Sequence, residues 1–448
     1  MTSILLVALI CIGTTSYVLS QNSSQTITIE PASFTETASY IIFKVGDTYY
    51  AKNGTTGEIE FSGTDASQVI QSAINALPSE HGGTVFLKAG KYIITHTIYL
   101  NKTHVQLRGE GTYATWLELA DNADCSLLQI GHPTAHLMFN GVFDLSLHGN
   151  KANNTKGSGI LVYGYRVSDM HIERVICMSC PFDGIHLEPL NGPVDGSGAR
   201  FWNIWIKNCL FEYCNIGVDI DANAYKGPIW QVWLDNVYVY NNDLHGIVIQ
   251  GGDDDYVKWI NINNPHVRAN GGYGIRIRPA RYVSIINPHV FDNQYGISIS
   301  GPSAFTTRYI SIVGGFSKNF KTTNQEYGII FDGNVEDCTI IGVDVSNNTV
   351  KGISNPPSSC IIEDCKGYVT ENSGTATIAN GEWIPHGLAG TPTVVTVTTL
   401  TPTYDGVPVV VGVASKNATH IQISAYWTNG TAITDDAIDI SWDAKYKP

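Results

Sequence analysis

The residues best suited to chemistry follow glycines in two neighbouring repeats of the sequence, GIHLE (184–188) and GVDID (217–221). In a β-strand, alternate side chains face the same way, so the polar residues of each repeat share one face while the aliphatic residues turn inward. If the two strands are neighbours, Glu188 and Asp221 stand side by side, roughly 5 Å apart. The two repeats supply four candidate catalytic residues: His186, Glu188, Asp219 and Asp221.

Two carboxylates at this separation repel each other, which favours a proton on one of them and places an acid beside a base or nucleophile. A spacing near 5 Å is that of a retaining glycosidase. We therefore expect Glu188 and Asp221 to form an acid/base pair, with Asp219 and His186 as supporting groups. The alternative is that charged side chains on exposed strands form ordinary cross-strand ion pairs.

These repeats belong to a longer series in which a glycine precedes an apolar-x-apolar triplet. The spacings run from 22 to 33 residues, and Asn- and Gly-rich turns fill the gaps. A short strand with such a period indicates a solenoid, and coils of this length leave room for three strands each. We expect an all-β protein built on a parallel β-helix. The glycines of the series are Gly159, Gly184, Gly217, Gly246, Gly274, Gly296 and Gly328.

The outward positions of the other triplets extend the same face. Tyr163 precedes the acidic pair by one repeat, Gln250 follows it, and Arg276 and Arg278 come next. An arginine can hold the carboxylate of a uronic-acid sugar. In an elimination, such a cation also stabilises the enolate formed when the α-proton leaves. The following repeat has Ser298 and Ser300 at the two arginine positions, although its winding residues are unchanged.

Insertions follow three of these strands, at 189–200, 222–230 and 251–256. Insertions on one edge of a solenoid build a wall beside a groove. Trp202, Tyr225 and Trp230 lie near them and are expected to stack on sugar rings, or alternatively to pack over the solenoid flank. The sequence predicts no cofactor other than calcium, which the run Asp253, Asp254 and Asp255 could hold if it is not simply a solvated turn.

The N-terminus indicates an exported protein, and the overall charge limits its partners. An apolar run from Ile4 to Ile12 is followed by small polar residues, which is typical of a signal peptide ending near Ser20; an uncleaved anchor is the alternative. The formal charge of −14 and the scattered Lys and Arg argue against nucleic acid or membrane as a partner after signal cleavage. We expect a secreted glycoprotein, with Asn-x-Ser/Thr sequons at Asn22, Asn53, Asn101, Asn153, Asn347, Asn417 and Asn429. The cysteines are interpreted as buried thiols or disulfides rather than zinc ligands.

The N-terminal third carries a family resemblance. In TDASQVIQSAINALP (64–78) the apolar residues follow helical spacing, with Thr64 and Asp65 as caps and Pro78 after the last turn. The stretch GGTVFLKAGKYIIT (82–95) then predicts two short strands about a turn. Together these segments resemble the lead-in of the pectate-lyase-like superfamily. The resemblance covers roughly 38–370 and implies a capping helix followed by a right-handed parallel β-helix; the superfamily includes lyases, hydrolases, epimerases, tailspikes and adhesins.

Within that superfamily, the polygalacturonases offer a closer comparison. Phe182-Asp183-Gly184, Leu244-His245-Gly246 and Arg276-Ile277-Arg278 occur in the order of three polygalacturonase motifs, which implies substrate contacts for Asp183 and His245. The middle coil reads Cys214-Asn215-Ile216-Gly217 where that family carries its Asp pair. The resemblance therefore does not extend to the mechanism of pectin hydrolysis.

The last part of the chain has another character. The glycine-triplet period ends, and Trp383-Ile-Pro-His-Gly-Leu and Ile440-Ser-Trp resemble the small β-sandwich that ends many phage tail and secreted surface proteins. Such a module binds, trimerises or caps the solenoid, so a homotrimer is one expectation. The predicted organisation is a signal peptide (1–20), a strand-rich lead-in (21–60), the β-helix (61–370) and a C-terminal β-sandwich (374–448).

These observations favour a protein that cleaves an extracellular polysaccharide, by hydrolysis or elimination, in a groove along the glycine-triplet strands. The alternative is a non-catalytic adhesin or virion fibre protein that binds cell-surface glycans through its C-terminal module.

Overall fold

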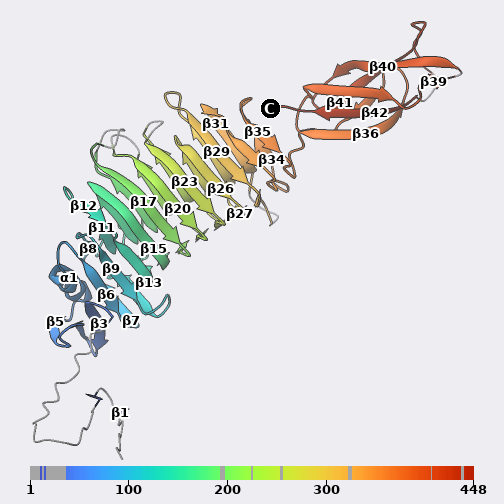
Figure 1. The fold of residues 1–448 in the computed structure, drawn as a ribbon. Helices are drawn as coiled ribbons and strands as arrows, with labels where there is room; N and C mark the ends of the chain where they lie inside the picture. The colour runs from blue at the N-terminus through green and yellow to red at the C-terminus, as the bar shows by residue number, and fades with distance from the viewer. Residues whose placement is uncertain are drawn as a thin grey trace, which may run out of the picture.

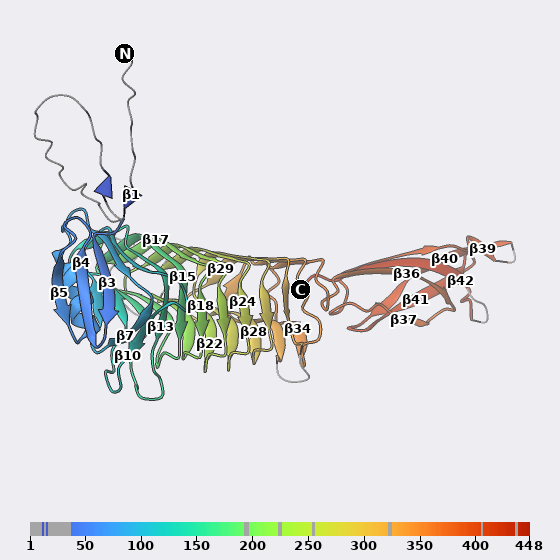
Figure 2. The same ribbon diagram turned by 90° about the horizontal axis from the view of Figure 1, so that it is seen from below.

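The strands wind into a long parallel β-helix, with a separate C-terminal module beyond its last coil (Figures 1 and 2). The computed structural model describes residues 37–191, 197–222, 226–252, 256–320, 325–404, 406–434 and 438–448, with the short strands β1 (Cys11–Ile12) and β2 (Thr15–Ser16). Within these residues no helix is long and apolar enough to cross a membrane. The expected all-β fold is confirmed.

The glycine triplets build a parallel sheet of ten strands, here called the site sheet. Its register is the one that the triplets predict: His186 pairs with Asp219, Asp219 with Val248, and Val248 with Arg276. The strands are β8 (Ile98–Leu100), β11 (Leu128–Ile130), β14 (Ile160–Gly164), β16 (Ile185–Pro189), β19 (Ile216–Ala222), β22 (His245–Gly251), β25 (Tyr273–Arg278), β28 (Tyr295–Gly301), β31 (Tyr327–Gly333) and β34 (Lys351–Ser354).

After the site-sheet strands the chain turns into strands on a second face, here called the long-strand face because most of them are longer than those of the third face. Its strands pair in parallel from coil to coil. They include β9 (Val105–Gly109), β13 (Gly141–His148), β15 (Arg166–Met178), β17 (Arg200–Lys207), β20 (Ile229–Asp235), β23 (Val257–Asn263), β26 (Arg281–Ile286), β29 (Thr307–Val313), β32 (Val335–Glu336), β33 (Thr339–Ile341) and β35 (Ile361–Glu363).

A bend then leads into a third, short-strand face. Asn208, Asn236, Asn264 and Asn287 occupy this bend with φ between 49° and 54°, a left-handed conformation that asparagine tolerates better than most residues. Their side chains hydrogen-bond from coil to coil, so the repeated Asn-Pro-His-Val phrase at 264 and 287 marks one structural position. The short strands are β10 (Thr115–Leu119), β18 (Leu210–Glu212), β21 (Tyr238–Tyr240), β24 (His266–Arg268), β27 (His289–Phe291) and β30 (Phe316–Lys318).

The interior is a continuous aliphatic core formed by the inward residues of all three faces. Asn242, Asn270 and Asn293 are buried within it: Asn242 donates to Asn270, Asn270 donates to Asn293, and each also donates to a backbone carbonyl. The cysteines from Cys125 onward are free thiols, and all but Cys125 are buried.

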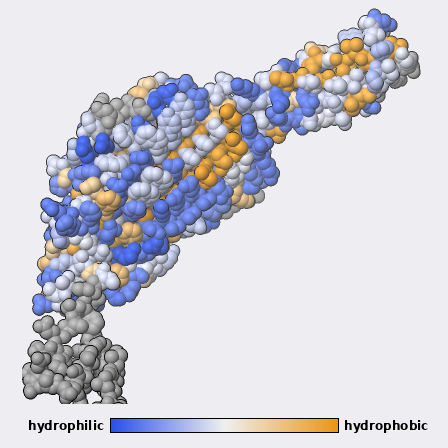
Figure 3. Space-filling model, in the orientation of Figure 1, coloured by the Kyte–Doolittle hydropathy of each residue, from blue (hydrophilic) through white to orange (hydrophobic). Residues whose placement is uncertain are grey.

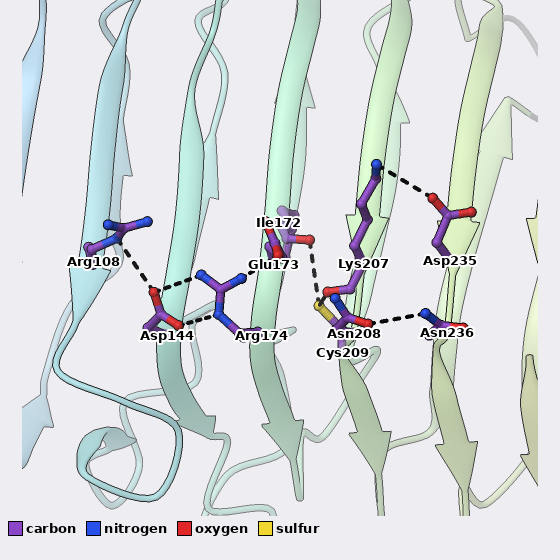
Figure 4. A network of polar contacts seen from close by, with 10 residues as sticks. All are labelled: Arg108, Asp144, Ile172, Glu173, Arg174, Lys207, Asn208, Cys209, Asp235 and Asn236. Atoms are coloured by element: carbon purple, nitrogen blue, oxygen red, sulfur yellow. Dashed lines mark hydrogen bonds and ion pairs between the residues drawn. The ribbon is translucent and has the colours of Figure 1, made fainter.

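Charged residues on the outside of the long-strand face mostly alternate in sign between coils (Figure 4). Asp144 Oδ2 lies 3.5 Å from Arg108 Nε, and Asp144 Oδ1 lies 2.5 Å from Arg174 Nε. Lys207 Nζ lies 3.6 Å from Asp235 Oδ2 on the next coil. These are cross-strand pairs that contribute little individually to stability because they are exposed. Further along this face, Figure 3 shows an apolar stripe over β26 and β29, where Ile286 and Val313 are exposed.

The N-terminal end of the β-helix is capped by an α-helix, as predicted. Helix α1 (Ala66–Ala76) begins after Asp65, whose carboxylate accepts hydrogen bonds from the backbone N–H groups of Ser67 and Gln68. Its apolar side buries Val69, Ile70 and Ile74 against the first coil. The other strands at this end are β3 (Tyr40–Val45), β4 (Thr48–Asn53), β5 (Ile59–Gly63), β6 (Gly83–Leu87), β7 (Gly90–Ile94) and β12 (His136–Met138).

The C-terminal module consists of two antiparallel sheets around a core of their own. One sheet contains β36 (Glu371–Ile378), β38 (Val394–Thr399) and β42 (Ile438–Lys445); the other contains β37 (Trp383–Pro385), β39 (Thr403–Tyr404), β40 (Val407–Lys416) and β41 (His420–Trp427). This arrangement agrees with the expected small β-sandwich.

Candidate active site

Two columns of outward side chains run along the site sheet, one side chain from each coil. The parallel register fixes their order, because each strand pairs residue for residue with its neighbour. The first column is Leu161, His186, Asp219, Val248, Arg276, Ser298 and Ile330. The second is Tyr163, Glu188, Asp221, Gln250, Arg278, Ser300 and Asp332.

His186 lies at the centre of the acidic part of these columns. Its Nδ1 is 2.6 Å from Asp183 Oδ2 and 3.7 Å from Asp219 Oδ2. Its Nε2 is 3.3 Å from Glu188 Oε2 and 3.9 Å from Asp221 Oδ2. Asp183, Asp219 and Asp221 are buried and Glu188 is partly exposed, so one imidazole is held among three buried carboxylates and one nearer to solvent.

Lys226 completes this cluster. Its Nζ is 3.2 Å from Glu188 Oε1 and contacts Asp221 Oδ2 even more closely. The chain after β19 places it there: Lys226 forms an antiparallel bridge with Asn191, and the N–H of Gly227 donates to the carbonyl of Leu190. The predicted pair Glu188 and Asp221 therefore lies on adjacent coils, as expected, with an ammonium group contacting both carboxylates.

The surroundings raise the pKa of both His186 and Asp219. Burial alone would lower the pKa of His186, but the hydrogen bond to Asp183, the contact with Glu188 and the charge of Asp219 raise it to about 10. Burial, reinforced by the charges of Asp183 and Asp221, raises the pKa of Asp219 to about 7 despite the nearby imidazole. His186 is thus a cation at neutral pH, and Asp219 exchanges a proton near neutrality.

Glu188 and Lys226 are fixed in their charged forms. The contact with His186, followed by the charge of Lys226, lowers the pKa of Glu188 to about 2 although burial opposes this change. Burial would lower the pKa of Lys226, but Asp221 and Glu188 raise it. A carboxyl group with so low a pKa is a poor proton donor, which suits Glu188 as a charge partner. The predicted acid/base pairing of Glu188 with Asp221 stays a prediction.

Asp183, His186 and Asp219 also have the chemistry of metal ligands, with one ligand atom from each residue within 4.8 Å of the others. A metal ion would need a neutral imidazole. In the absence of an ion, the carboxylates around His186 outweigh the effect of its burial and favour a proton on the ring. Asp219 Oδ1 is buried and has no hydrogen-bond partner among the described residues, so this oxygen is available to accept a proton.

The predicted anion-binding residues lie further along the same columns. Arg276 and Arg278 line a cavity of about 220 Å³ together with Tyr273, Ser298 and Ser300. The guanidinium of Arg276 lies 5.3 Å from the centre of the Tyr273 ring, and its Nη1 is 3.4 Å from Nε2 of His245. Burial, together with the charge of Arg276, lowers the pKa of His245 to about 4, so His245 is neutral.

The structure brings together some predicted residues and separates others. Gln250 lies between Asp221 and Arg278 in the second column, and Tyr163 lies one coil before Glu188. Trp202 and Trp230 are on the long-strand face, outside the cluster. Tyr225 and the calcium candidates Asp253, Asp254 and Asp255 lie outside the described residues, as do most of the signal-peptide and 21–36 segments.

The sequence patterns did not predict Lys226 as a residue of the site. Its only signal is a single lysine, five residues after Asp221, in the insertion 222–230. Asp183 was expected to contact substrate, but it also holds the proton of His186.

The fold and the site can now be compared with known proteins. Residues 135–308 match the family model described as a right-handed β-helix region. The chain is therefore a right-handed parallel β-helix protein, consistent with the pectate-lyase-like superfamily that its N-terminal segments resemble.

Its relatives include the mannuronan C5-epimerases AlgE5 and AlgE2 of Azotobacter vinelandii. AlgE5 is 26% identical over 249 residues, which is 53% of this chain and 23% of AlgE5; AlgE2 is 25% identical over 226 residues, which is 48% of this chain and 21% of AlgE2. This chain thus spans less than a quarter of the length of these relatives.

Two solved structures share the fold. The A-module of mannuronan C-5 epimerase AlgE4 from Azotobacter vinelandii has a TM-score of 0.52 and 18% identity, covering 68% of this chain and 92% of that one. The pre-mature gene product 12 of bacteriophage phi29 has a TM-score of 0.50 and 17% identity, covering 67% of this chain and 43% of that one.

Proposed function

We propose that this chain acts on an acidic polysaccharide and moves a proton at the carbon next to the carboxylate of a uronate sugar. One observation carries the proposal: a cationic His186 and a titratable Asp219 adjoin on the same exposed face as two arginines. The sequence relatives named as mannuronan C5-epimerases add support, because mannuronan is a polymer of uronate residues.

The reaction class follows from the protonation states. Glycoside hydrolysis by a carboxyl pair needs one carboxylic acid to protonate the leaving oxygen. Glu188 is held as a carboxylate by its contact with His186 and the charge of Lys226, so it is a poor candidate for that acid. We therefore favour epimerisation or elimination over hydrolysis.

Both reactions begin with removal of the proton from C5 of the uronate. The electron pair moves towards the carboxylate, and cations stabilise the charge that accumulates there. Lys226 and His186 supply this positive charge within the cluster. In epimerisation a proton then returns to C5 from the opposite face; in elimination the C4–O bond breaks, and the leaving oxygen takes up a proton.

Two groups in the cluster fit these proton transfers. Asp219 has a pKa near neutrality and a buried oxygen without a hydrogen-bond partner in the described structure, which suits a proton acceptor. His186 is protonated, and its buried Nε2 lies 3.3 Å from the partly exposed Glu188, which suits a donor. Arg276 and Arg278, two coils beyond Asp219, would hold the carboxylate of another sugar of the same chain.

Solvent exchange tests the proposal directly. Purified protein is incubated in D2O with polymannuronate, polyguluronate or polygalacturonate, and NMR follows deuterium at C5 while ultraviolet absorbance follows unsaturated products. We expect deuterium at C5 of at least one polymer, and its loss in His186→Gln. The matched control is His289→Gln on the short-strand face, which leaves the cluster intact.

The competing function is non-catalytic glycan binding, with the solenoid as a rigid support. Binding to these polymers with neither C5 exchange nor new products would favour it over the enzyme. An extracellular location belongs to either function and remains part of the proposal; N-terminal sequencing of the exported protein would test cleavage near Ser20. Analytical ultracentrifugation would test the homotrimer.

A further inference from the structure

We propose that the long-strand face carries a second, non-catalytic binding site for an anionic polysaccharide. It consists of three exposed aromatic residues on consecutive coils, Trp259, Tyr282 and Tyr309, here called the aromatic stripe, and of a cation next to each. The stripe belongs to β23, β26 and β29, whereas the candidate active site belongs to β16 and β19. The inference therefore stands whether or not the proposed function holds.

The rings of the stripe are exposed and parallel. Trp259, Tyr282 and Tyr309 expose 43%, 47% and 41% of their surface. The ring centres of Trp259 and Tyr282 are 6.3 Å apart with 17° between the planes, and those of Tyr282 and Tyr309 are 5.0 Å apart with 12° between them. These separations exceed the ~3.5–4.0 Å of direct carbon contact, so the rings are offset and part of each face stays open.

The fold does not require aromatic residues at these positions. All three have a positive φ, between 56° and 59°. The equivalent positions of other coils are also left-handed; four carry the polar residues Asp169, Asn203, Gln231 and Asp337, and one carries Phe139. Asparagine and aspartate adopt this conformation readily, whereas a bulky aromatic residue does so at a cost in conformational energy. The aromatic side chains therefore point to a role other than winding.

The cations form a second column beside the stripe. Lys258 pairs in register with Arg281, and Arg281 with Arg308. Like charges directly opposite each other destabilise a sheet, and this face also places opposite charges on neighbouring coils, as at Lys207 and Asp235 and at Arg308 and Glu336. Lys258 Nζ lies 4.8 Å from the Trp259 ring centre, and the Arg308 guanidinium 5.9 Å from that of Tyr309.

The two columns together define the ligand. A line of cations at the coil spacing of about 4.8 Å complements a polymer with regularly spaced negative charges. Rings beside that line suit flat, partly apolar repeating units. A polysaccharide of uronate residues has both features, since each sugar offers a carboxylate and a face of C–H groups. Single-stranded nucleic acid shares this chemistry in part, but the formal charge of −14 on the chain disfavours it, so it serves as an outcome of the test.

The experiment replaces the stripe by the residue that the same column uses elsewhere. The triple variant Trp259→Asn, Tyr282→Asn and Tyr309→Asn keeps the left-handed preference and removes the rings. Calorimetric titration uses a mannuronate hexasaccharide, a neutral glucan hexasaccharide and a single-stranded DNA oligonucleotide. All measurements are made in an Arg276→Ser/Arg278→Ser background, which weakens binding in the cavity of the candidate site.

We expect the triple variant to bind the mannuronate hexasaccharide at least tenfold more weakly, without a lower melting temperature. The matched control is Tyr113→Asn, an exposed tyrosine with φ of 65° far from the stripe, which should leave binding unchanged. The neutral hexasaccharide should bind more weakly than the charged one to the parent protein. Arg281→Gln/Arg308→Gln should weaken only the charged ligand.

Three results would overturn the inference. Unchanged binding of mannuronate by the triple variant would overturn it. If the melting temperature of that variant also falls, the three rings stabilise the fold. Tighter binding of DNA than of mannuronate would assign the face to another polymer. A change in the sedimentation of the triple variant with no change in affinity would make the stripe a contact between copies of this chain.

Discussion

The Nδ1 atom of His186 lies 2.6 Å from Oδ2 of Asp183, three residues earlier in the chain. Asp183 precedes the strand and His186 is its second residue, so the turn into β16 sets their separation. Both side chains are largely removed from solvent, which strengthens the attraction between the imidazolium and the carboxylate.

Asp183→Asn should lower the pKa of His186 from about 10 towards its ordinary value of 6.5, because it removes the charge that holds the proton. If activity needs protonated His186, the alkaline limb of the pH–rate profile should move to lower pH by one or more units. NMR titration of the His186 ring would measure the pKa directly. An unchanged His186 titration would contradict the electrostatic role of Asp183.

Lys226→Met should reduce turnover by roughly two orders of magnitude, because it removes the charge nearest to Glu188 and Asp221. Lys226→Arg should retain more activity than Lys226→Met, since it preserves the charge. Lys207→Met is the matched control, because Lys207 pairs with a carboxylate on the long-strand face. Steady-state rates of these variants on the preferred polymer test the role of Lys226. Equal rates for Lys226→Met and Lys207→Met would exclude Lys226 from the mechanism.

Asp219→Asn should abolish activity but stabilise the folded protein at alkaline pH. The pKa of Asp219 is about 7 in the folded state and 3.8 in the reference state, so ionisation opposes folding above pH 7. As the pH falls from 7 to below 3.8, this penalty disappears. The gain in the free energy of unfolding should be on the order of 4 kcal/mol at pH 8 and below about 1 kcal/mol at pH 4. Denaturant unfolding at both pH values would measure it; a gain of equal size at pH 4 would contradict the ionisation argument.

The variant Arg276→Ser/Arg278→Ser replaces two arginines by the serines that the next coil carries at the same outward positions. The winding of the coil should therefore be preserved. We expect KM for an acidic polymer to rise about tenfold or more, with a smaller change in kcat, because the arginines act away from the reacting sugar. Added salt should weaken the parent enzyme more than this variant. If kcat falls with KM unchanged, the arginines belong to the chemistry itself.

The sequence predicted the columns of the site sheet correctly because winding imposes a strict rule. A glycine followed by alternating aliphatic residues decides which side chains point outward, and parallel stacking then sets their order. His186 opposite Asp219, and Gln250 between Asp221 and Arg278, follow from that rule alone.

The same rule does not predict which side chains reach the site from loops. Lys226 arrives through a bridge to Asn191, which depends on how two insertions meet. Trp202 and Trp230 seemed close to the site in sequence, but the turn after each site-sheet strand carries them to another face. The proton affinities of His186 and Asp219 were beyond the sequence too, because they depend on burial and on charges from two coils at once.

The bend formed by Asn208, Asn236, Asn264 and Asn287 has a consequence for how such a molecule can change. Four successive coils close on a hydrogen-bonded asparagine at the same position, so a whole coil among them can be added or removed without disturbing its neighbours. One coil, that of Gln250, separates the acidic cluster from the arginines. Excising it would bring the two groups closer by one step of about 4.8 Å. The number of coils between the acidic cluster and the arginines therefore sets the distance between the reacting groups and the groups that hold the polymer.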